Sequence, residues 1–195
     1  MVDMILNSFI EAGILQKEEY TLYYYCLDAL LSKAFFIIAI LGLALFLDKV
    51  SIMIAYYFGF LLIRYTNGGY HANSPISCFI LSIGIYLGAL GLTDIMSIES
   101  HPEILSVTLF CVIFIVWRFA PVDHPNKRFS PEEKLAYRKK GRITVVCCVI
   151  LAIILWLLNN RLGWAFIIGI AVAALSIVAA VKKRKEGIKY VKKFV

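Results

Sequence analysis

Two side chains in the segment Arg64–Cys78, RYTNGGYHANSPISC, could carry out nucleophilic chemistry together. These are the thiol of Cys78 and the imidazole of His71, and a cysteine with a histidine base is the minimal arrangement for acyl transfer. In one straight helix, their offset in sequence would separate them by about 10 Å along the axis. The chain must therefore bend between them. The run Asn67-Gly68-Gly69 is typical of such a bend, because glycine permits positive φ and the close approach of another backbone.

The dipeptide Ser74-Pro75 predicts the start of the helix that carries Cys78. Serine is favoured at the N-cap and proline at the first helical position, and an apolar run follows at once. Cys78 then lies in the first turn, where free N–H groups and the helix dipole favour a thiolate. Ordinary roles compete with this interpretation. A single cysteine at the end of a membrane helix is usually a packing residue, a single loop histidine is usually a surface residue, and Gly-Gly pairs are common in plain turns.

The composition predicts an integral membrane protein. Of the 195 residues, 61% are hydrophobic and only 17% are charged, whereas soluble domains carry about 25% charged residues. The net charge of +7 is too small and too scattered to indicate a nucleic-acid partner. The five cysteines form neither a disulfide framework nor a zinc pattern, and no metal or cofactor is predicted. Two further histidines receive no catalytic role: His101 is expected to be structural, and His124, beside Asp123, is a rival base in a distant loop.

Six apolar segments predict an all-α, polytopic membrane protein with a single membrane-embedded domain over residues 1–195. The second segment is short, with Arg64 snorkelling toward the interface, so it is the least certain span. Residues 1–25 predict an amphipathic helix on the membrane surface, and residues 182–195 predict a basic cytoplasmic tail. The predicted spans are Leu27–Leu47, Val50–Ile63, Ile76–Thr93, Ile104–Phe119, Ile143–Leu158 and Leu162–Val181.

The distribution of Lys and Arg predicts the orientation in the cytoplasmic membrane. Eight of these residues lie between positions 118 and 142 and seven follow position 181, whereas residues 94–103 contain none. With six spans, every basic-rich segment falls on the same side. The positive-inside rule then places both termini, the 64–75 segment and the 118–142 segment in the cytoplasm.

The 118–142 segment begins with an irregular, proline-containing loop and continues as a basic helix. Ser130-Pro131-Glu132-Glu133 is a strong helix start, with Ser at the cap and Glu in the first turn. The plain interpretation of the basic residues is that they set topology and attract anionic lipid. A sharper one is that they bind an acidic peptide. The candidate substrate-binding residues are Lys127, Lys134, Arg138, Lys139 and Lys140.

These two segments together resemble the signatures of the accessory gene regulator protein B family. RYTNGGYHANSPISC is similar to the family's Arg-x-x-x-Gly-Gly-x-His-(six residues)-Cys signature, and FAPVDHPNK is similar to its second, an Ala-Pro-x-Asp loop that ends in Asn-Lys. Motif order, length and span number extend the resemblance over essentially the whole chain. One departure is His124-Pro125, which stands in the variable part of the second signature.

The resemblance implies a cysteine endopeptidase of Gram-positive quorum sensing. Such enzymes cut a small amphipathic precursor peptide and release a cyclic thiolactone or lactone autoinducer. The catalytic pair of the family matches His71 and Cys78, and its Arg and glycines match Arg64, Gly68 and Gly69, for which oxyanion stabilisation or structural support is expected. The resemblance also implies a homodimer.

Two other functions are consistent with parts of the sequence. A small transporter is one, but only Asp28 and Lys33 approach the interior of a span, and no span is broken by proline. A membrane cysteine peptidase that hydrolyses its substrate without cyclising it is the other. The sequence does not separate it from a cyclase, because the group that closes the ring belongs to the substrate.

Overall fold

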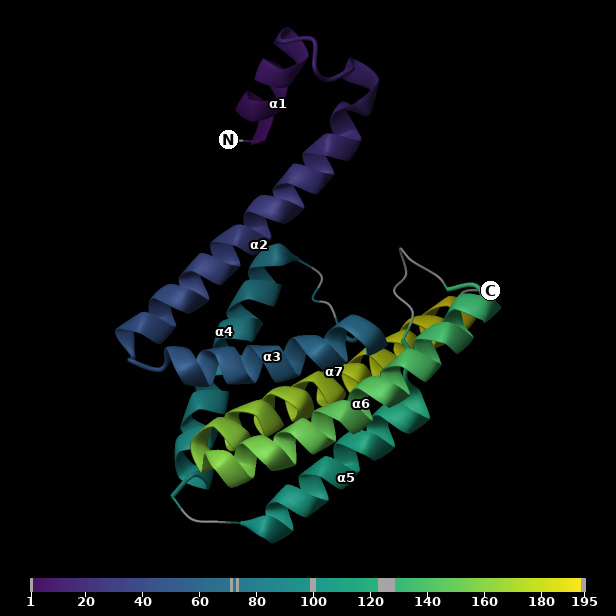
Figure 1. The fold of residues 1–195 in the computed structure, drawn as a ribbon. Helices are drawn as coiled ribbons and strands as arrows, with labels where there is room; N and C mark the ends of the chain where they lie inside the picture. The colour runs from purple at the N-terminus through teal and green to yellow at the C-terminus, as the bar shows by residue number, and fades with distance from the viewer. Residues whose placement is uncertain (1, 71, 73, 99–100, 123–128, 194–195) are drawn as a thin grey trace. The chain divides into compact units, whose positions relative to one another are not determined.

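The computed structural model describes residues 2–70, 72, 74–98, 101–122 and 129–193, and within these ranges the regular structure is entirely helical. This confirms the predicted all-α fold. A short 3-10 turn, η1 (Lys17–Glu19), follows the first of seven α-helices (Figure 1). The α-helices are α1 (Val2–Glu11), α2 (Tyr20–Phe46), α3 (Val50–Asn67), α4 (Pro75–Met96), α5 (Pro102–Phe119), α6 (Pro131–Leu158) and α7 (Asn160–Lys193).

The chain divides into two units, residues 1–48 and 49–195. In the first unit, α1 folds back on the beginning of α2 after a turn at Gly13, which has a φ of 69°. Leu6 and Leu15 are buried in this contact, and the hydroxyl of Tyr20 donates a 2.7 Å hydrogen bond to Asp3. The predicted amphipathic helix over residues 1–25 is thus shorter than expected. It ends at Glu11, just before the turn at Gly13, and the residues from Tyr20 onward belong to the long helix α2.

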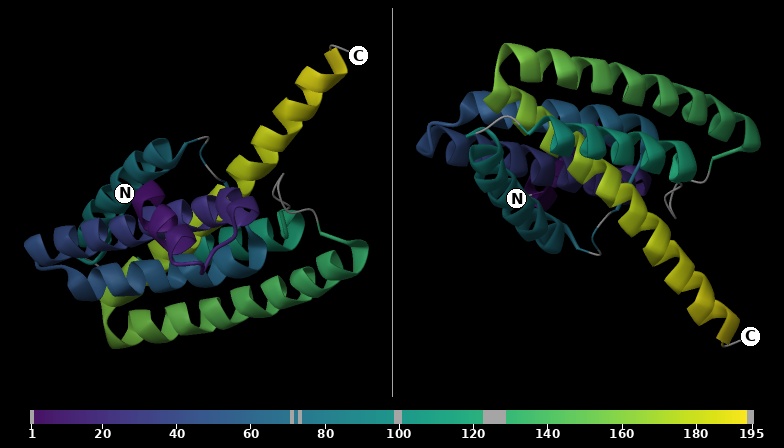
Figure 2. Two further views of the ribbon diagram at one scale, coloured as in Figure 1. Left: turned by 90° about the horizontal axis from the view of Figure 1, so that it is seen from above. Right: turned by 90° about the horizontal axis from the view of Figure 1, so that it is seen from below.

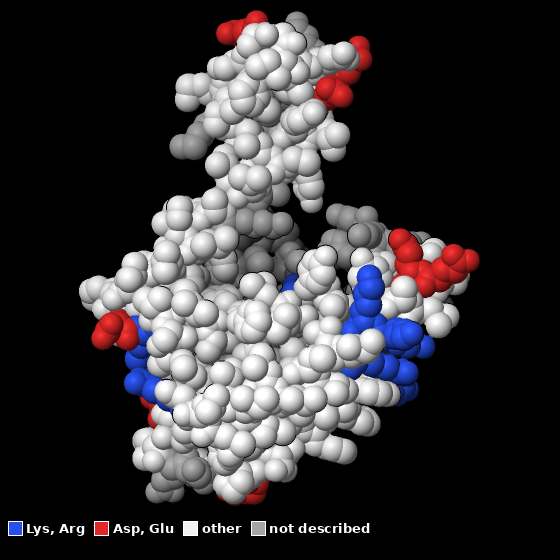
Figure 3. Space-filling view, viewed as in Figure 1, with Lys and Arg blue, Asp and Glu red and all other residues white. Residues whose placement is uncertain are grey.

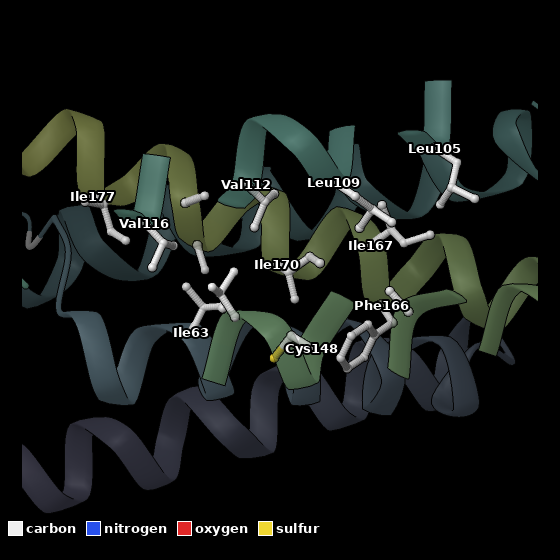
Figure 4. Close-up of a cluster of buried hydrophobic side chains, with 14 of the residues drawn as sticks. Ile63, Leu105, Leu109, Val112, Val116, Cys148, Phe166, Ile167, Ile170 and Ile177 are labelled. Atoms are coloured by element: carbon white, nitrogen blue, oxygen red, sulfur yellow. The ribbon is translucent and has the colours of Figure 1, made fainter. Parts of the chain in front are cut away.

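The core of the second unit lies between α3, α5, α6 and α7. Buried aliphatic side chains converge there, with Phe166 at one side (Figure 4). The buried residues of α5 recur at helical spacing, so one face of that helix points inward while the opposite face is exposed. The labelled members of this core are Ile63, Leu105, Leu109, Val112, Val116, Cys148, Phe166, Ile167, Ile170 and Ile177.

Helices α3 and α7 pack with their backbones unusually close. A Cβ on Gly59 would lie 2.7 Å from the carbonyl oxygen of Phe166, and a Cβ on Gly169 would overlap the carbonyl of Tyr56. Small residues allow such contact between helices in a membrane, where dispersion forces and hydrogen bonds replace the hydrophobic effect. The middle of α3 therefore lies directly against α7.

Polar contacts mark the two opposite ends of the second unit. At one end, Asp94 near the end of α4 pairs with Lys49 before α3 and with Arg161 in the first turn of α7, at 2.6 Å. At the other end, the last residue of α3, Asn67, packs against Gly141 of α6. The five helices α3–α7 thus run alternately between the same two ends, as expected for a multi-pass membrane protein.

In the part of the chain that the structure describes, five helices are long and apolar enough to cross a membrane: α2, α4, α5, α6 and α7. Helix α3 is not among them, so the predicted six-span count is not exactly confirmed. Its last turn consists of Arg64, Tyr65, Thr66 and Asn67, and these polar residues lower its mean hydropathy. At 1.5 Å per residue, α7 is about 50 Å long and exceeds a hydrocarbon core of about 30 Å. Its C-terminal part accordingly projects beyond the other helices of the second unit (Figure 2).

Candidate active site

Cys78 lies in the first turn of α4, as the sequence predicts. Ser74 is the N-cap, with extended backbone, and its hydroxyl accepts a 3.2 Å hydrogen bond from the amide of Ser77. The amide of Cys78 donates to the carbonyl of Ser74 at 3.0 Å, which closes the first helical turn. The thiol is exposed. A nucleophile at this position combines access to a substrate with the favourable electrostatics of a helix N-terminus.

The turn after α3 is anchored by a buried asparagine. Asn67 is fully buried, and its amide nitrogen donates 2.9 Å hydrogen bonds to the carbonyl of Ile63 and the hydroxyl of Thr66. The side chain lies directly over Gly141 of α6, where an added Cβ would overlap its amide oxygen and lie 3.0 Å from its Cγ. By its sequence context, Asn67 is expected to be an ordinary turn residue. In the folded chain it joins the end of α3 to α6.

Gly68, the residue after Asn67, faces the second signature segment at Val122. Gly68 has a φ of 72°, and an added Cβ would lie 2.7 Å from the carbonyl oxygen of Val122. The amide of Val122 in turn donates a 3.1 Å hydrogen bond to the carbonyl of Asn67. This confirms the expectation that Gly-Gly admits a second backbone. The backbone in question is the irregular segment after α5, in which Ala120 and Pro121 are buried.

Arg64 turns inward and bonds to the protein. Its Nη1 donates to the hydroxyl of Ser176 on α7 at 2.9 Å, and its Nη2 donates to the carbonyl of Tyr70. The amide of Tyr70 donates to the carbonyl of Ser176 at 2.9 Å. Gly69, with a φ of 150°, lies inside this ring of bonds, and an added Cβ would lie 2.5 Å from the Ser176 hydroxyl. Arg64 therefore holds the turn against α7.

The guanidinium of Arg64 also lies within electrostatic range of Cys78. Its two hydrogen-bond acceptors, the Ser176 hydroxyl and the Tyr70 carbonyl, are neutral oxygens. Neutral acceptors do not cancel the charge of the guanidinium, so it can attract a nearby anion. A thiolate on Cys78 is such an anion.

His71, Asp123, His124 and Lys127 lie outside the described residues. The structure does describe the residue before His71, because the amide and carbonyl of Tyr70 both belong to the bonded ring. The residue immediately before His71 is thus held in place by two hydrogen bonds. His101 caps the start of α5, and its Nδ1 lies 3.5 Å from the carboxylate of Glu103, far along the chain from this site.

The basic residues of α6 and α7 gather at the same end of the second unit as this turn. Figure 3 shows a patch of Lys and Arg side chains where α6 begins. Arg138, Lys139 and Lys140 are exposed, and Lys134 is half-buried. Helix α7 adds Lys183, whose ammonium group lies 4.9 Å from the ring centroid of Tyr70. A basic surface therefore adjoins the anchored turn.

Sequence reasoning did not identify two residues of this site. Ser176 is a single serine in an apolar span, and Gly141 follows a run of basic residues with no turn signal. Their role is seen only from their contacts with other residues in the folded chain. A weak signal for Gly141 is that glycine weakens a helix interior, so its presence there suggests close packing.

Comparison with known proteins gives consistent matches. The family model "Accessory gene regulator B" matches residues 2–177. A "Putative AgrB-like protein" from Clostridium perfringens is 26% identical over 145 residues, covering 71% of this chain and 68% of that protein. "Protein FsrB" from Enterococcus faecalis is 25% identical over 196 residues, covering 98% of this chain and 78% of that protein. No solved structure matches significantly.

Proposed function

Because this chain belongs to the accessory gene regulator B family, we propose that it is a membrane cysteine endopeptidase that cleaves and cyclises a small precursor peptide. Family membership supports involvement in autoinducer-peptide processing and quorum sensing. The proposed enzyme class adds the chemistry: a thioester acyl-enzyme on Cys78 and release of a thiolactone or lactone. The observation that carries this proposal is the exposed thiol of Cys78 in the capped first turn of α4, within electrostatic range of Arg64.

The first half-reaction forms the acyl-enzyme. His71 takes the proton of the Cys78 thiol, and the thiolate attacks the carbonyl carbon of the scissile peptide bond. The resulting oxyanion is stabilised by the positive charge of Arg64 or by N–H groups at the start of α4. Collapse of the tetrahedral intermediate breaks the C–N bond, and His71 returns its proton to the departing amine. The C-terminal fragment leaves, and the N-terminal part stays bound as a thioester.

The second half-reaction closes the ring. A thiol or hydroxyl of the bound peptide loses its proton to His71 and attacks the thioester carbonyl, and the sulfur of Cys78 departs and is reprotonated. Exchange of one thioester for another is nearly isoenergetic, so the exclusion of water decides between cyclisation and hydrolysis. A plain peptidase differs only in admitting water at this step.

The substrate would reach this site along the membrane surface. The amphipathic part of the precursor lies in the interface, and its acidic end binds the basic surface formed by Lys134, Arg138, Lys139 and Lys140. The cytoplasmic location of that surface, of the active site and of both termini follows from the positive-inside rule. Anionic lipid and a second copy of the chain are further proposed partners.

Mass spectrometry of a candidate precursor tests this function. The small amphipathic peptide encoded nearby is co-expressed with the wild-type chain, Cys78→Ala or His71→Ala, and Cys147→Ala serves as the matched control because its thiol is also exposed. We expect cleavage with the wild type and the control, and a product one water lighter than the linear fragment. Neither active-site variant should cleave.

Each other outcome points to a different function. A linear product retains the peptidase and removes the cyclase. Cleavage by a well-inserted Cys78→Ala variant removes the proposed mechanism altogether. If the chain is instead a transporter, solute flux across proteoliposomes should occur and should survive the loss of Cys78.

A further inference from the structure

We infer that Ser176 is a positioning residue of the active site, acting through Arg64 and through the backbone that leads into His71. The inference deepens the proposed function and rests on it. It starts from the position of one side chain: Ser176 lies on α7, in an apolar stretch, and is separated from Arg64 by 112 residues of sequence.

The side-chain hydroxyl and the main-chain carbonyl of Ser176 each contact the turn separately. The hydroxyl accepts the 2.9 Å bond from Nη1 of Arg64 and donates a 2.7 Å bond to the carbonyl of Ala173 one turn back. The main-chain carbonyl accepts the 2.9 Å bond from the amide of Tyr70. Because the hydroxyl has one donor and is already committed to Ala173, it can only accept from Arg64. The direction of both bonds is therefore determined.

These bonds close a ring through three parts of the fold. Arg64 at the end of α3 reaches both Ser176 and the carbonyl of Tyr70, while Tyr70 reaches Ser176 through its amide. Gly69 lies within the ring and has no room for a side chain. Lys183, two turns further along α7, covers the ring of Tyr70. One face of α7 thus determines where the guanidinium points and where the chain stands immediately before His71.

The consequence for the chemistry comes from the position of Arg64 relative to Cys78. A long, flexible arginine exerts a defined charge on a nucleophile only if its guanidinium is held in place. Without the Ser176 hydroxyl, Nη1 loses its acceptor and the guanidinium can reorient, although the bond to the Tyr70 carbonyl remains. We therefore expect Ser176→Ala to lower the reactivity of Cys78 while leaving the main-chain link intact.

The first test measures Cys78 without a peptide substrate. The full-length protein is treated with iodoacetamide in detergent, and the rate of alkylation at Cys78 is followed by mass spectrometry. The loss of a whole hydrogen bond to a charged group corresponds to a change of more than about tenfold. Because Arg64 keeps its bond to the Tyr70 carbonyl, we expect Ser176→Ala to lower the rate by less, about three- to tenfold. Ser176→Thr keeps the hydroxyl and should lie closer to the wild type. Ser106→Ala is the matched control, since Ser106 also bonds to its own helix, at the carbonyl of Pro102, but in α5.

The second test asks whether Ser176 acts through Arg64. In a double-mutant cycle, Ser176→Ala should have little further effect once Arg64→Gln has removed the guanidinium. Equal effects of Ser176→Ala in both backgrounds would overturn the inference, as would wild-type alkylation in Ser176→Ala itself. A rate that falls only in proportion to the loss of monodisperse protein would also overturn it, because that result describes a structural residue.

The two proposals fail in distinguishable ways. If the wild type does not cleave the precursor, the proposed function is lost, yet the alkylation comparison still decides the role of Ser176. If the wild type cleaves the precursor and Ser176→Ala cleaves it at the same rate with normal Cys78 alkylation, only the inference about Ser176 is lost.

Discussion

The amide of Val122 donates a 3.1 Å hydrogen bond to the carbonyl of Asn67, which joins the two signature segments into one site. The contact is reinforced by Gly68, whose missing side chain lets the carbonyl of Val122 approach. The segment after α5 therefore packs directly against the turn that leads to His71. This contact is separate from any role of the segment in setting membrane topology. Disturbance of either segment should affect the other.

Gly141→Ala should destabilise the second unit and abolish most processing. The added methyl group overlaps the buried side chain of Asn67, which cannot move without releasing the turn, and overpacking of this kind costs about 1–3 kcal/mol. Thermal unfolding in detergent and precursor cleavage measure the two effects. Gly84→Ala in α4 is the control, since its Cβ would meet nothing within 4 Å. Equal melting temperatures for the two variants would contradict the proposed packing.

Gly68→Ala should cost more stability than a change in backbone preference alone explains. Its φ of 72° and ψ of −154° lie in a region that is essentially restricted to glycine and costs an L-residue about 1–3 kcal/mol, and the methyl group also meets the carbonyl of Val122 at 2.7 Å. Gly13→Ala separates the two contributions, because Gly13 has a φ of 69° but open space around it. We expect the melting temperature to fall further for Gly68→Ala. If both variants lose the same amount, contact with Val122 contributes nothing.

Asp94→Asn should lower stability modestly and leave the chemistry unchanged. Asp94 pairs with Lys49 and Arg161 at the end of the unit opposite Cys78, and these side chains are 37%, 23% and 51% exposed. Exposed pairs contribute about 0.2–1 kcal/mol each, and each kcal/mol lost lowers the melting temperature by about 2–4 °C in a chain of this size. Thermal unfolding and the ratio of cyclic to linear product test this. A changed product ratio at normal stability would show that this end takes part in processing.

Tyr86→Phe should leave stability unchanged or raise it by up to about 1 kcal/mol. Tyr86 is fully buried beside Tyr56 and Tyr57, and its hydroxyl has no hydrogen-bond partner within the described part of the chain. Removal of an unpaired buried hydroxyl relieves a desolvation cost. Tyr65→Phe, at a side chain that is 87% exposed, is the control. A loss of stability larger than that of the control would reveal a partner for the hydroxyl.

Charge reversal at Lys139 and Lys140 should weaken precursor binding more than membrane insertion. Both side chains are exposed on α6 at the end that carries the anchored turn, and exposed charge pairs contribute about 0.2–1 kcal/mol each. We expect KM for a synthetic precursor to rise several-fold in Lys139→Glu/Lys140→Glu and less in the Gln double variant, with the difference shrinking at high salt. An unchanged KM in a correctly inserted protein would rule out this surface as the peptide site.

Much of the fold can be predicted from local sequence patterns. Apolar runs determine where α2, α4, α5, α6 and α7 form, and Ser74-Pro75 and Ser130-Pro131 mark helix starts that the structure confirms, the second with a full capping box. These features are predictable because hydropathy and capping act within a few residues. Helix α3 is less predictable, since its polar last turn reduces its hydropathy, whereas contacts with α7 and α6 hold Arg64 and bury Asn67 in that turn.

The chemistry-bearing residues themselves came from sequence, because the spacing of Arg64, Gly68, Gly69, His71 and Cys78 is a local property that family resemblance makes specific. What tertiary structure alone decided is which distant groups hold them. Ser176, Val122 and Gly141 lie on three other segments, and the sequence around them does not show which residues of the turn they contact. The physical reason is that a hydrogen bond or a close backbone contact depends on where helices cross. Those crossings are determined by the packing of whole helices, such as α3 on α7, and not by any short stretch of chain.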